Sequence, residues 1–218
     1  MRCKKVGEYI CANCFARISF DTKPLCLACG KNSIDGRTHP HCLRNYTIDG
    51  AFCGVVYRDI VRKLVYQFKY QPYLTSLQSV LTDLLYESLI QQQAFIHALK
   101  FKPFLVPIPL SQNRLKKRGY NQSELLAIGL SKKFDLPVVH LLTRIKETVP
   151  QFGLSREDRQ ENMKGAFKIN DKGLRINDAK TVFLIDDILT TGSTLHEAAK
   201  ILKKNGFEKV WGIALAKD

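Results

Sequence analysis

The fold of this chain is decided by the stretch Val182-Phe-Leu-Ile-Asp186-Asp187-Ile-Leu-Thr190-Thr191-Gly192-Ser193-Thr194. Its four leading apolar residues predict a buried strand, and the hydroxyl- and glycine-rich turn after the aspartates opens a helical pattern. The first turn of a helix leaves backbone N–H groups unpaired and carries partial positive charge, so it can bind phosphate. Gly192 has no Cβ and would let a phosphate approach the backbone closely. We therefore expect a phosphate-binding turn between a strand and a helix.

Two carboxylates, Asp186 and Asp187, follow the apolar run. They could hold ribose hydroxyls or the water shell of magnesium, an ion that usually shares its ligands with substrate phosphates. As a simple helix cap the pair makes little sense, because adjacent carboxylates repel each other. The run resembles the signature of type I phosphoribosyltransferases, which bind 5-phosphoribosyl-1-pyrophosphate (PRPP). The resemblance implies that the 5-phosphate lies on Thr190, Thr191, Gly192, Ser193 and Thr194.

A second strand–loop–helix unit precedes this one along the chain. The sequence predicts a short buried strand over residues 104–109, a polar basic loop over residues 111–123 and a helix over residues 123–133. Strands that alternate with helices predict a mostly parallel sheet, whose loops meet at the carboxyl ends of its strands. Cations in this loop suit pyrophosphate, since guanidinium groups match phosphate oxygens. The candidates are Arg114, Lys116 and Arg118.

The rest of the chain fits the same fold class. We expect a strand or hairpin over residues 48–57, helical segments over residues 59–68 and 74–99, and a last strand over residues 210–216. Residues 142–168 are polar and helical only near residues 155–163, so they form either a disordered connection or a flap over the site. Residues 46–218 are therefore predicted to form an α/β domain of the type I phosphoribosyltransferase kind, a mostly parallel twisted sheet with flanking helices.

The composition limits the location and the partners. The N-terminus lacks the apolar core of a secretory signal, and no apolar run approaches the ~20 residues that cross a bilayer. We therefore expect a cytoplasmic protein with no membrane span. The formal net charge of +14 over 218 residues predicts attraction to a polyanion, although surface lysines kept for solubility are the alternative. We favour nucleic acid as the partner.

The first 45 residues predict a small zinc-binding module. Cys11-Ala-Asn-Cys14 and Cys26-Leu-Ala-Cys29 are two Cys-x-x-Cys knuckles, which can supply four thiolates to structural zinc. The segment has too few apolar residues to bury a core, so metal binding would stabilise its fold. His39 and Cys42 offer an alternative that would complete a site with Cys26 and Cys29. Cys53 lies in an apolar alternation and is interpreted as a buried thiol.

Taken together, these motifs are similar to those of the ComF family of bacterial competence proteins. The similarity extends over the whole chain and rests on the cysteine knuckles, Phe68-Lys69-Tyr70, Val106-Pro-Ile-Pro-Leu110, Arg118-Gly-Tyr-Asn-Gln-Ser123, Gln151, Arg159, Asn162, Gly165-Ala-Phe167 and the run from Asp186 to Thr194. The resemblance implies a zinc-ribbon segment followed by a phosphoribosyltransferase-like domain. It also implies a role in DNA uptake during natural transformation, where the family handles single-stranded DNA in the cytoplasm beside a helicase-like partner and recombination proteins.

The chain departs from the family pattern at two points. Many members carry four Cys-x-x-Cys pairs, whereas here the first is reduced to Cys3 and the last to His39-x-x-Cys42. In addition, 6-oxopurine salvage enzymes place an aspartate where Thr190 stands, as the base for the incoming purine. Threonine cannot act as that base, so 6-oxopurine salvage is disfavoured.

Three functions are compatible with the sequence. In the first, a DNA-handling competence protein binds PRPP and magnesium, with Asp186 and Asp187 on the ribose and the cationic loop on pyrophosphate, and transfers phosphoribosyl to an unknown acceptor. In the second, the protein is a nucleobase salvage transferase. In the third, PRPP is a regulatory ligand of a binding protein without catalysis. For the DNA, a stacking groove is suggested by aromatic residues that alternate with Lys63 and Lys69, although core packing explains them equally well. These aromatic residues are Tyr66, Phe68, Tyr70 and Tyr73.

Overall fold

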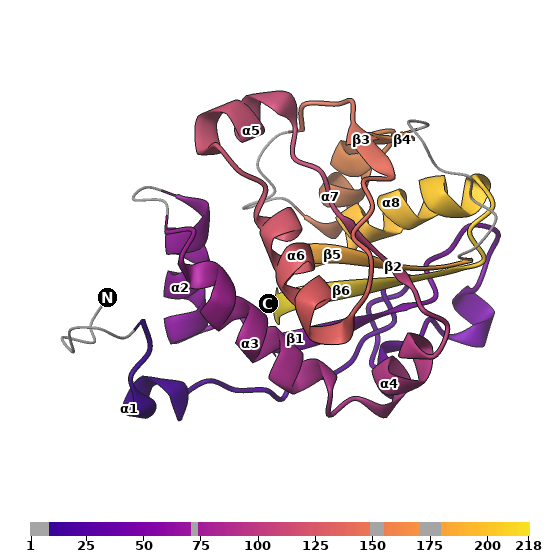
Figure 1. Cartoon of the computed structure of the whole chain (residues 1–218). Helices are drawn as coiled ribbons and strands as arrows, with labels where there is room; N and C mark the ends of the chain where they lie inside the picture. The colour runs from indigo at the N-terminus through magenta and orange to yellow at the C-terminus, as the bar shows by residue number, and fades with distance from the viewer. Residues whose placement is uncertain (1–8, 71–73, 149–154, 171–179) are drawn as a thin grey trace.

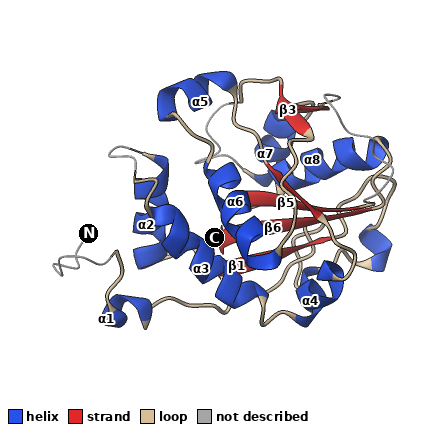
Figure 2. Ribbon diagram, in the orientation of Figure 1, coloured by secondary structure: helices blue, strands red, loops and turns tan. Residues whose placement is uncertain are grey.

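The centre of the molecule is a four-stranded parallel sheet. The computed structural model describes residues 9–70, 74–148, 155–170 and 180–218. The strands lie in the order β1-β6-β5-β2, and each neighbouring pair is parallel (Figures 1 and 2). Their bounds are Gly50–Val56 for β1, Phe104–Pro107 for β2, Thr181–Leu189 for β5 and Lys209–Lys217 for β6. The predicted mostly parallel sheet is confirmed.

Helices cover both faces of this sheet. Their bounds are Asp59–Lys69 for α2, Leu77–Leu89 for α3, Gln93–Leu99 for α4, Gln112–Arg118 for α5, Gln122–Phe134 for α6, Arg156–Met163 for α7 and Ser193–Lys204 for α8. A separate antiparallel pair consists of β3, Leu142–Arg144, and β4, Phe167–Ile169. Near the N-terminus lie α1, Ala12–Phe15, and two 3₁₀ turns, Ile34–Gly36 and Pro40–Cys42.

The alternation of side chains along β5 explains the two layers. Successive residues of a strand point to opposite faces, and a parallel sheet covered by helices is apolar on both. Phe183 and Ile185 lie in the core that α2, α3 and α6 share, whereas Val182 and Leu184 lie in the core with α8. The uninterrupted apolar run from Val182 to Ile185 is therefore what a sheet covered on both faces requires.

Three expectations need correction. The loop over residues 111–123 contains a helix, α5, whose basic last turn is favourable at a helix C-terminus and which ends at Gly119 with φ 82°. The helical stretch 74–99 is two helices, α3 and α4. The polar connection contains the β3–β4 pair, which is too short for its alternation to stand out. The part of that connection over residues 149–154, with Gln151, lies outside the described residues.

The N-terminal segment packs against the outer edge of β1. The amide of Val56 donates to the Ser19 carbonyl over 2.9 Å, Arg37 pairs with Gly50, and Ile18 is buried in the core. An exposed strand edge invites unwanted pairing, so this cover protects the sheet. Among the described helices, none is long and apolar enough to cross a bilayer.

Candidate functional site

The carboxyl end of β5 places both aspartates at the edge of the sheet. β5 continues through them to Leu189 because its pairing with β6 extends to Lys217. The backbone N–H of Asp187 donates to Asp186 Oδ1 over 2.8 Å, and the Ser123 hydroxyl donates to the same oxygen over 3.3 Å. Burial, followed by the charge of Asp187, raises the pKa of Asp186 to about 7. This carboxyl therefore titrates near neutral pH.

Asp187 forms an ion pair that the sequence analysis missed. Lys69, the last residue of α2, brings its Nζ to 2.9 Å from Asp187 Oδ1, and the two side chains are only 18% and 5% exposed. The second oxygen, Asp187 Oδ2, is buried and has no hydrogen-bond partner among the described residues. A buried acceptor without a partner is costly, so this atom points to a ligand hydroxyl, water or cation.

The turn after β5 has the geometry of a phosphate cradle. Gly192 caps α8 in the left-handed conformation, with φ 78°. The hydroxyls of Thr191 and Ser193 lie 2.8 Å apart, and a small hollow is lined by residues of the turn together with Asp186. A Cβ on Gly192 would lie 3.0 Å from the Leu27 side chain. Glycine is thus required here by the backbone and by a neighbour from the N-terminal segment.

The start of α6 joins the basic loop to the acidic pair. Asn121 caps α6 by accepting from the Ser123 amide over 3.1 Å, and its Nδ2 donates to the Ile108 carbonyl over 3.0 Å. Gln122 accepts a hydrogen bond from Arg118. Because Ser123 also reaches Asp186, this turn places Arg118 and the acidic pair around the same edge of the sheet.

Two arginines gather on the other side of the loop. Arg114 donates to the Thr148 carbonyl over 2.7 Å, and Arg144 of β3 donates to the Thr148 hydroxyl. Burial lowers the pKa of Arg144 to about 10, with a further contribution from the charge of Arg114. The Nε of Arg144 is buried without a hydrogen-bond partner among the described residues. Two neighbouring guanidinium groups favour a bound anion, which would relieve their repulsion.

The structure thus brings most of the predicted residues to one sheet edge. Lys116 lies on the exposed part of α5. Lys69 and Arg144 were not assigned to this site from the sequence: Lys69 entered only as part of a family motif and as a cation of a possible DNA groove, and Arg144 lies in a segment without a local signal. The helix over residues 59–68 was predicted from its apolar residues, which say nothing about the position of Lys69. Arg144 lies in the polar connection over residues 142–168. Only the packing of α2 and β3 around β5 reveals their position.

A second cluster contains three thiols and an imidazole. The ligand atoms of Cys26, Cys29, His39 and Cys42 all lie within 4.8 Å of one another. His39 Nδ1 is 3.4 Å from Cys29 Sγ, and its Nε2 is 3.0 Å from the Asn32 carbonyl. A carbonyl partner makes Nε2 the protonated nitrogen and leaves Nδ1 as the ligand atom. These four residues therefore fit tetrahedral zinc.

This arrangement corresponds to the alternative pairing of the sequence analysis. The second knuckle, Cys26 and Cys29, joins His39 and Cys42. Cys11 and Cys14 are not members of this group, so their role as ligands stays a prediction.

The cysteine cluster contacts the candidate phosphate turn and α7. Leu27, between two of the clustered thiols, is the residue that lies against Gly192. Arg156 Nη2 of α7 donates to the carbonyls of Leu27 and Ala28 over 3.1 and 3.3 Å. The cysteine cluster therefore packs directly against the candidate phosphate turn.

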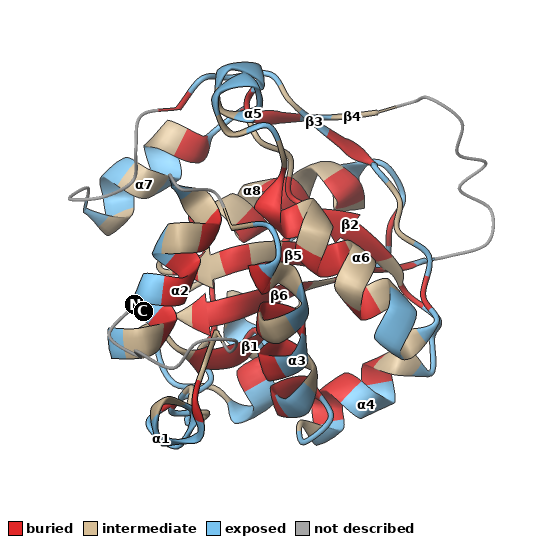
Figure 3. Cartoon of the chain, turned by 60° about the vertical axis from the view of Figure 1, so that its left-hand side comes forward, coloured by how far each residue is buried: buried red, intermediate tan, exposed pale blue. Residues whose placement is uncertain are grey.

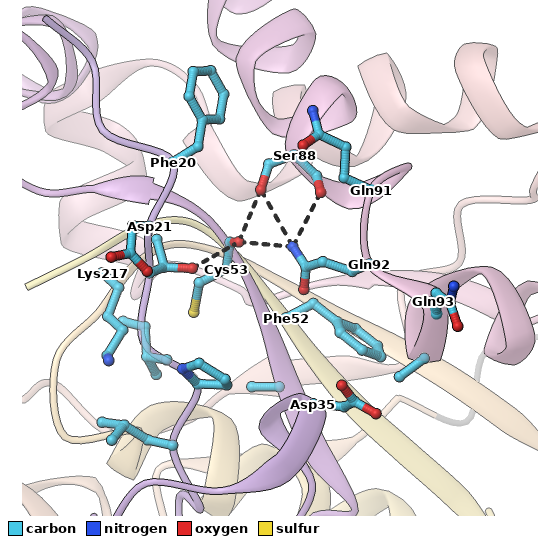
Figure 4. Close-up of a pocket in the computed structure, with 16 residues that line it drawn as sticks. Phe20, Asp21, Asp35, Phe52, Cys53, Ser88, Gln91, Gln92, Gln93 and Lys217 are labelled. Carbon is cyan, nitrogen blue, oxygen red and sulfur yellow. Dashed lines mark hydrogen bonds between the residues drawn. The ribbon is translucent and has the colours of Figure 1, made fainter.

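A further pocket of about 480 Å³ lies away from the acidic pair, between the N-terminal segment, β1 and the α3–α4 junction. Figure 4 shows Ser88 and Gln92 pointing at the Cys53 carbonyl, to which they donate over 3.2 and 3.0 Å. Burial raises the pKa of the Cys53 thiol to about 12. A protonated thiol is a poor nucleophile, in keeping with the buried thiol expected for Cys53.

The fold and this site define a phosphoribosyltransferase domain, and residues 111–217 match the family model described as "Phosphoribosyl transferase domain". The chain is 32% identical to competence protein F of Haemophilus influenzae, over 96% of this chain and 98% of that one. It is 31% identical to the DNA utilization protein YhgH of Escherichia coli K12, over 90% and 85% of the two chains. Competence protein ComFC of Bacillus subtilis is 27% identical over 93% and 81%. The chain belongs to the ComF family of competence proteins.

Proposed function

We propose that this protein handles single-stranded DNA during natural transformation and binds PRPP with magnesium at the carboxyl end of β5. The observation that carries the proposal is the orphaned Asp187 Oδ2 beside a half-buried Asp186 and a glycine-capped helix. The names of the relatives, which refer to competence and DNA utilization, support the role in transformation. We place the protein in the cytoplasm, where imported DNA arrives and where cysteines stay reduced.

In the proposed complex, each part of PRPP meets a different element. Asp186 and Asp187 accept hydrogen bonds from the ribose hydroxyls, and Thr190 to Thr194 donate to the 5-phosphate. Arg114, Arg144 and Arg118 neutralise the pyrophosphate, with Lys116 at the exposed rim. Lys69 pairs with Asp187 Oδ1 and leaves Oδ2 for the ligand. Magnesium would supply further charge to the pyrophosphate, held through water by the acidic pair.

The N-terminal residues 1–45 are proposed to form a zinc module and residues 46–218 the phosphoribosyltransferase-like domain. The zinc ligands in this proposal are Cys26, Cys29, His39 and Cys42. Zinc held by four protein ligands has no open position, so its role is structural. The helicase-like and recombination partners of the family are proposed on the resemblance alone.

Calorimetric titration of PRPP, with and without magnesium, tests the pocket. We expect binding by the wild-type protein and at least about 10-fold weaker binding by Asp187→Asn, because the ribose loses a charged acceptor. Asp83→Asn, an exposed aspartate of α3, is the matched control and should bind normally. A wild-type protein that gives no heat and no thermal stabilisation with PRPP would refute the proposal.

Pyrophosphate release then separates the competing functions. Release that requires a free nucleobase, without affinity for DNA, would make the protein a salvage transferase. Binding of PRPP without any release would make PRPP a regulatory ligand. Release that requires DNA or protein would identify the acceptor of a transfer reaction.

A further inference from the structure

The aromatic residues that the sequence grouped together lie in different environments at the end of α2. Phe68 is fully buried in the core, whereas Tyr66 and Tyr70 are 58% and 50% exposed. Their ring centroids lie 4.8 Å apart. The aromatic residues that alternate with lysine therefore comprise one core residue, Phe68, and an exposed pair, Tyr66 and Tyr70. Tyr73 lies outside the described residues. Figure 3 shows buried and exposed positions on this helix.

Cations surround the exposed tyrosines. Arg62 and Lys63 share the outer face of α2 with Tyr66, since residues three and four apart are neighbours on a helix. Arg118 comes from the end of α5, and its guanidinium lies 5.7 Å from the centre of the Tyr70 ring. Among the described residues, none of these three cations forms an ion pair with a carboxylate. We call Arg62, Lys63, Tyr66, Tyr70 and Arg118 the tyrosine face.

The tyrosine face borders the candidate PRPP site. Lys69 follows Tyr66 on the same helix and pairs with Asp187. The Tyr120 hydroxyl donates to the Phe68 carbonyl, which fixes the end of α2 to the segment between α5 and α6. Arg118 is shared, because it contacts Tyr70 on one side and Gln122 at the start of α6 on the other. The end of α2 therefore links the surface to the acidic pair.

We propose that the tyrosine face is the surface that binds single-stranded DNA, with bases stacked on Tyr66 and Tyr70 and phosphates on Arg62, Lys63 and Arg118. Exposed aromatic rings beside cations that form no carboxylate ion pair among the described residues suit a nucleic acid whose bases are free to stack, and the net charge of +14 agrees. In a duplex the bases stack on each other and leave the rings without partners. The bound strand would lie beside the acidic pair. This inference rests on the DNA binding in the proposed function.

Fluorescence anisotropy with a labelled oligothymidine tests the surface. We expect Tyr66→Ala and Tyr70→Ala each to weaken binding by about 5- to 100-fold, since each removes one stacking contact. Tyr66→Phe should bind like the wild type because it keeps the ring. Phe101→Ala, which removes a 60% exposed ring near α4, is the matched control and should have no effect. Tyr66→Ala should retain its affinity for PRPP.

The salt dependence distinguishes stacking from charge. Tyr66→Ala should leave the slope of log K against log salt unchanged, whereas Arg62→Gln and Lys63→Gln should each reduce its magnitude by about 0.7. A duplex of the same length should bind more weakly than the single strand. In a photo-crosslinking experiment with a bromouracil-substituted strand, the adducts should map to Tyr66 and Tyr70.

Three results would overturn the inference, and they differ from each other. If the wild type binds oligothymidine but both alanine variants bind equally well, the DNA lies elsewhere and the proposed function survives. If the wild type binds no single-stranded DNA while PRPP binds normally, the DNA-handling function fails together with its surface. Crosslinks that avoid both Tyr66 and Tyr70 would also contradict the inference, even if an alanine variant folds poorly.

Discussion

The pair Lys69–Asp187 shows how one charge organises the candidate site. Asp187 is buried, and a buried charge is costly unless it is paired. Lys69 Nζ lies 2.9 Å from Asp187 Oδ1, whereas Asp186 forms no ion pair among the described residues and burial raises its pKa to about 7. The two adjacent carboxylates therefore differ: Asp187 is paired with a lysine, and Asp186 titrates near neutral pH.

The raised pKa of Asp186 predicts a pH-dependent stability. Between its ordinary pKa of 3.8 and about 7, the folded protein binds more protons than the unfolded chain. This group therefore reduces the free energy of unfolding as the pH rises to about 7, by at most ~1.4 kcal/mol per pH unit. Asp186→Asn, which stays uncharged, should be more stable than the wild type at pH 8 and similar to it at pH 4. Urea unfolding at both pH values checks this.

Asp83→Asn serves as the control for that experiment. Asp83 is exposed and pairs with an exposed lysine, so the substitution should change the stability by no more than about 0.5 kcal/mol. A stability difference between Asp186→Asn and the wild type that is the same at pH 4 and pH 8 would contradict the prediction.

Gly192 predicts a coupling between the phosphate turn and the N-terminal module. Gly192→Ala strains a left-handed residue and pushes against Leu27. Gly206→Ala is the control: its φ of 95° gives the same backbone strain, but no atom lies within 4 Å of the new Cβ. Each should lose about 1 kcal/mol of stability, and only Gly192→Ala should lose a further amount together with PRPP affinity. Addition of Leu27→Ala should restore part of that loss. Urea unfolding and PRPP titration measure both effects, and equal losses in the two glycine variants would show that Leu27 is irrelevant.

At the scale of elements, the cysteine module is a structural part of the site. Its four clustered ligands come from two short turns that could not bury a core by themselves. Metal binding would stabilise these turns, and through Leu27 and Arg156 the phosphate turn and α7 as well. The module is thus more than an appendage to the domain.

The ligand set can be tested by zinc content. Cys29→Ala and Cys42→Ala should each lose the zinc of the cluster, because three ligands leave the site open. Cys11→Ala and Cys14→Ala should keep that zinc. Mass spectrometry under native conditions measures the metal, and a chelator should lower the Tm of the wild type much more than that of Cys29→Ala. Loss of the only zinc on substitution of Cys11 would restore the pairing of the two knuckles.

At the scale of the whole molecule, the chain has more basic residues than the PRPP site and the described ion pairs require. The 34 lysines and arginines exceed the 20 acidic residues by far more than a PRPP site needs. The described ion pairs use only some of the basic residues. The remaining cations create a positive field that attracts a polyanion over long distances.

This field predicts a steep salt dependence for DNA binding. The affinity for single-stranded DNA should fall between about 50 and 200 mM salt with a slope near −0.7 for each phosphate contacted. Anisotropy titrations at several salt concentrations give the slope, and PRPP binding on the same samples shows that the fold is intact. A flat dependence would refute binding through phosphates.

The sequence by itself determined the α/β class, the parallel sheet, the order of the strand–loop–helix units and the position of the acidic pair. These features depend on local periodicity and on motifs of neighbouring residues, which the chain encodes directly. Segments such as α5 and the β3–β4 pair escaped prediction because a seven-residue helix or three paired residues carry too little periodicity.

Only the tertiary structure decided which residues share a site. It placed Lys69 beside Asp187, Arg144 beside Arg114, Leu27 against Gly192, and His39 and Cys42 with the second knuckle. The first three contacts join elements far apart along the chain, and no spacing rule relates them. For the cysteine cluster the sequence offered two pairings, and only the structure chose between them. It also separated Phe68 from Tyr66 and Tyr70, because the direction in which a helix faces is set by the core against which it packs.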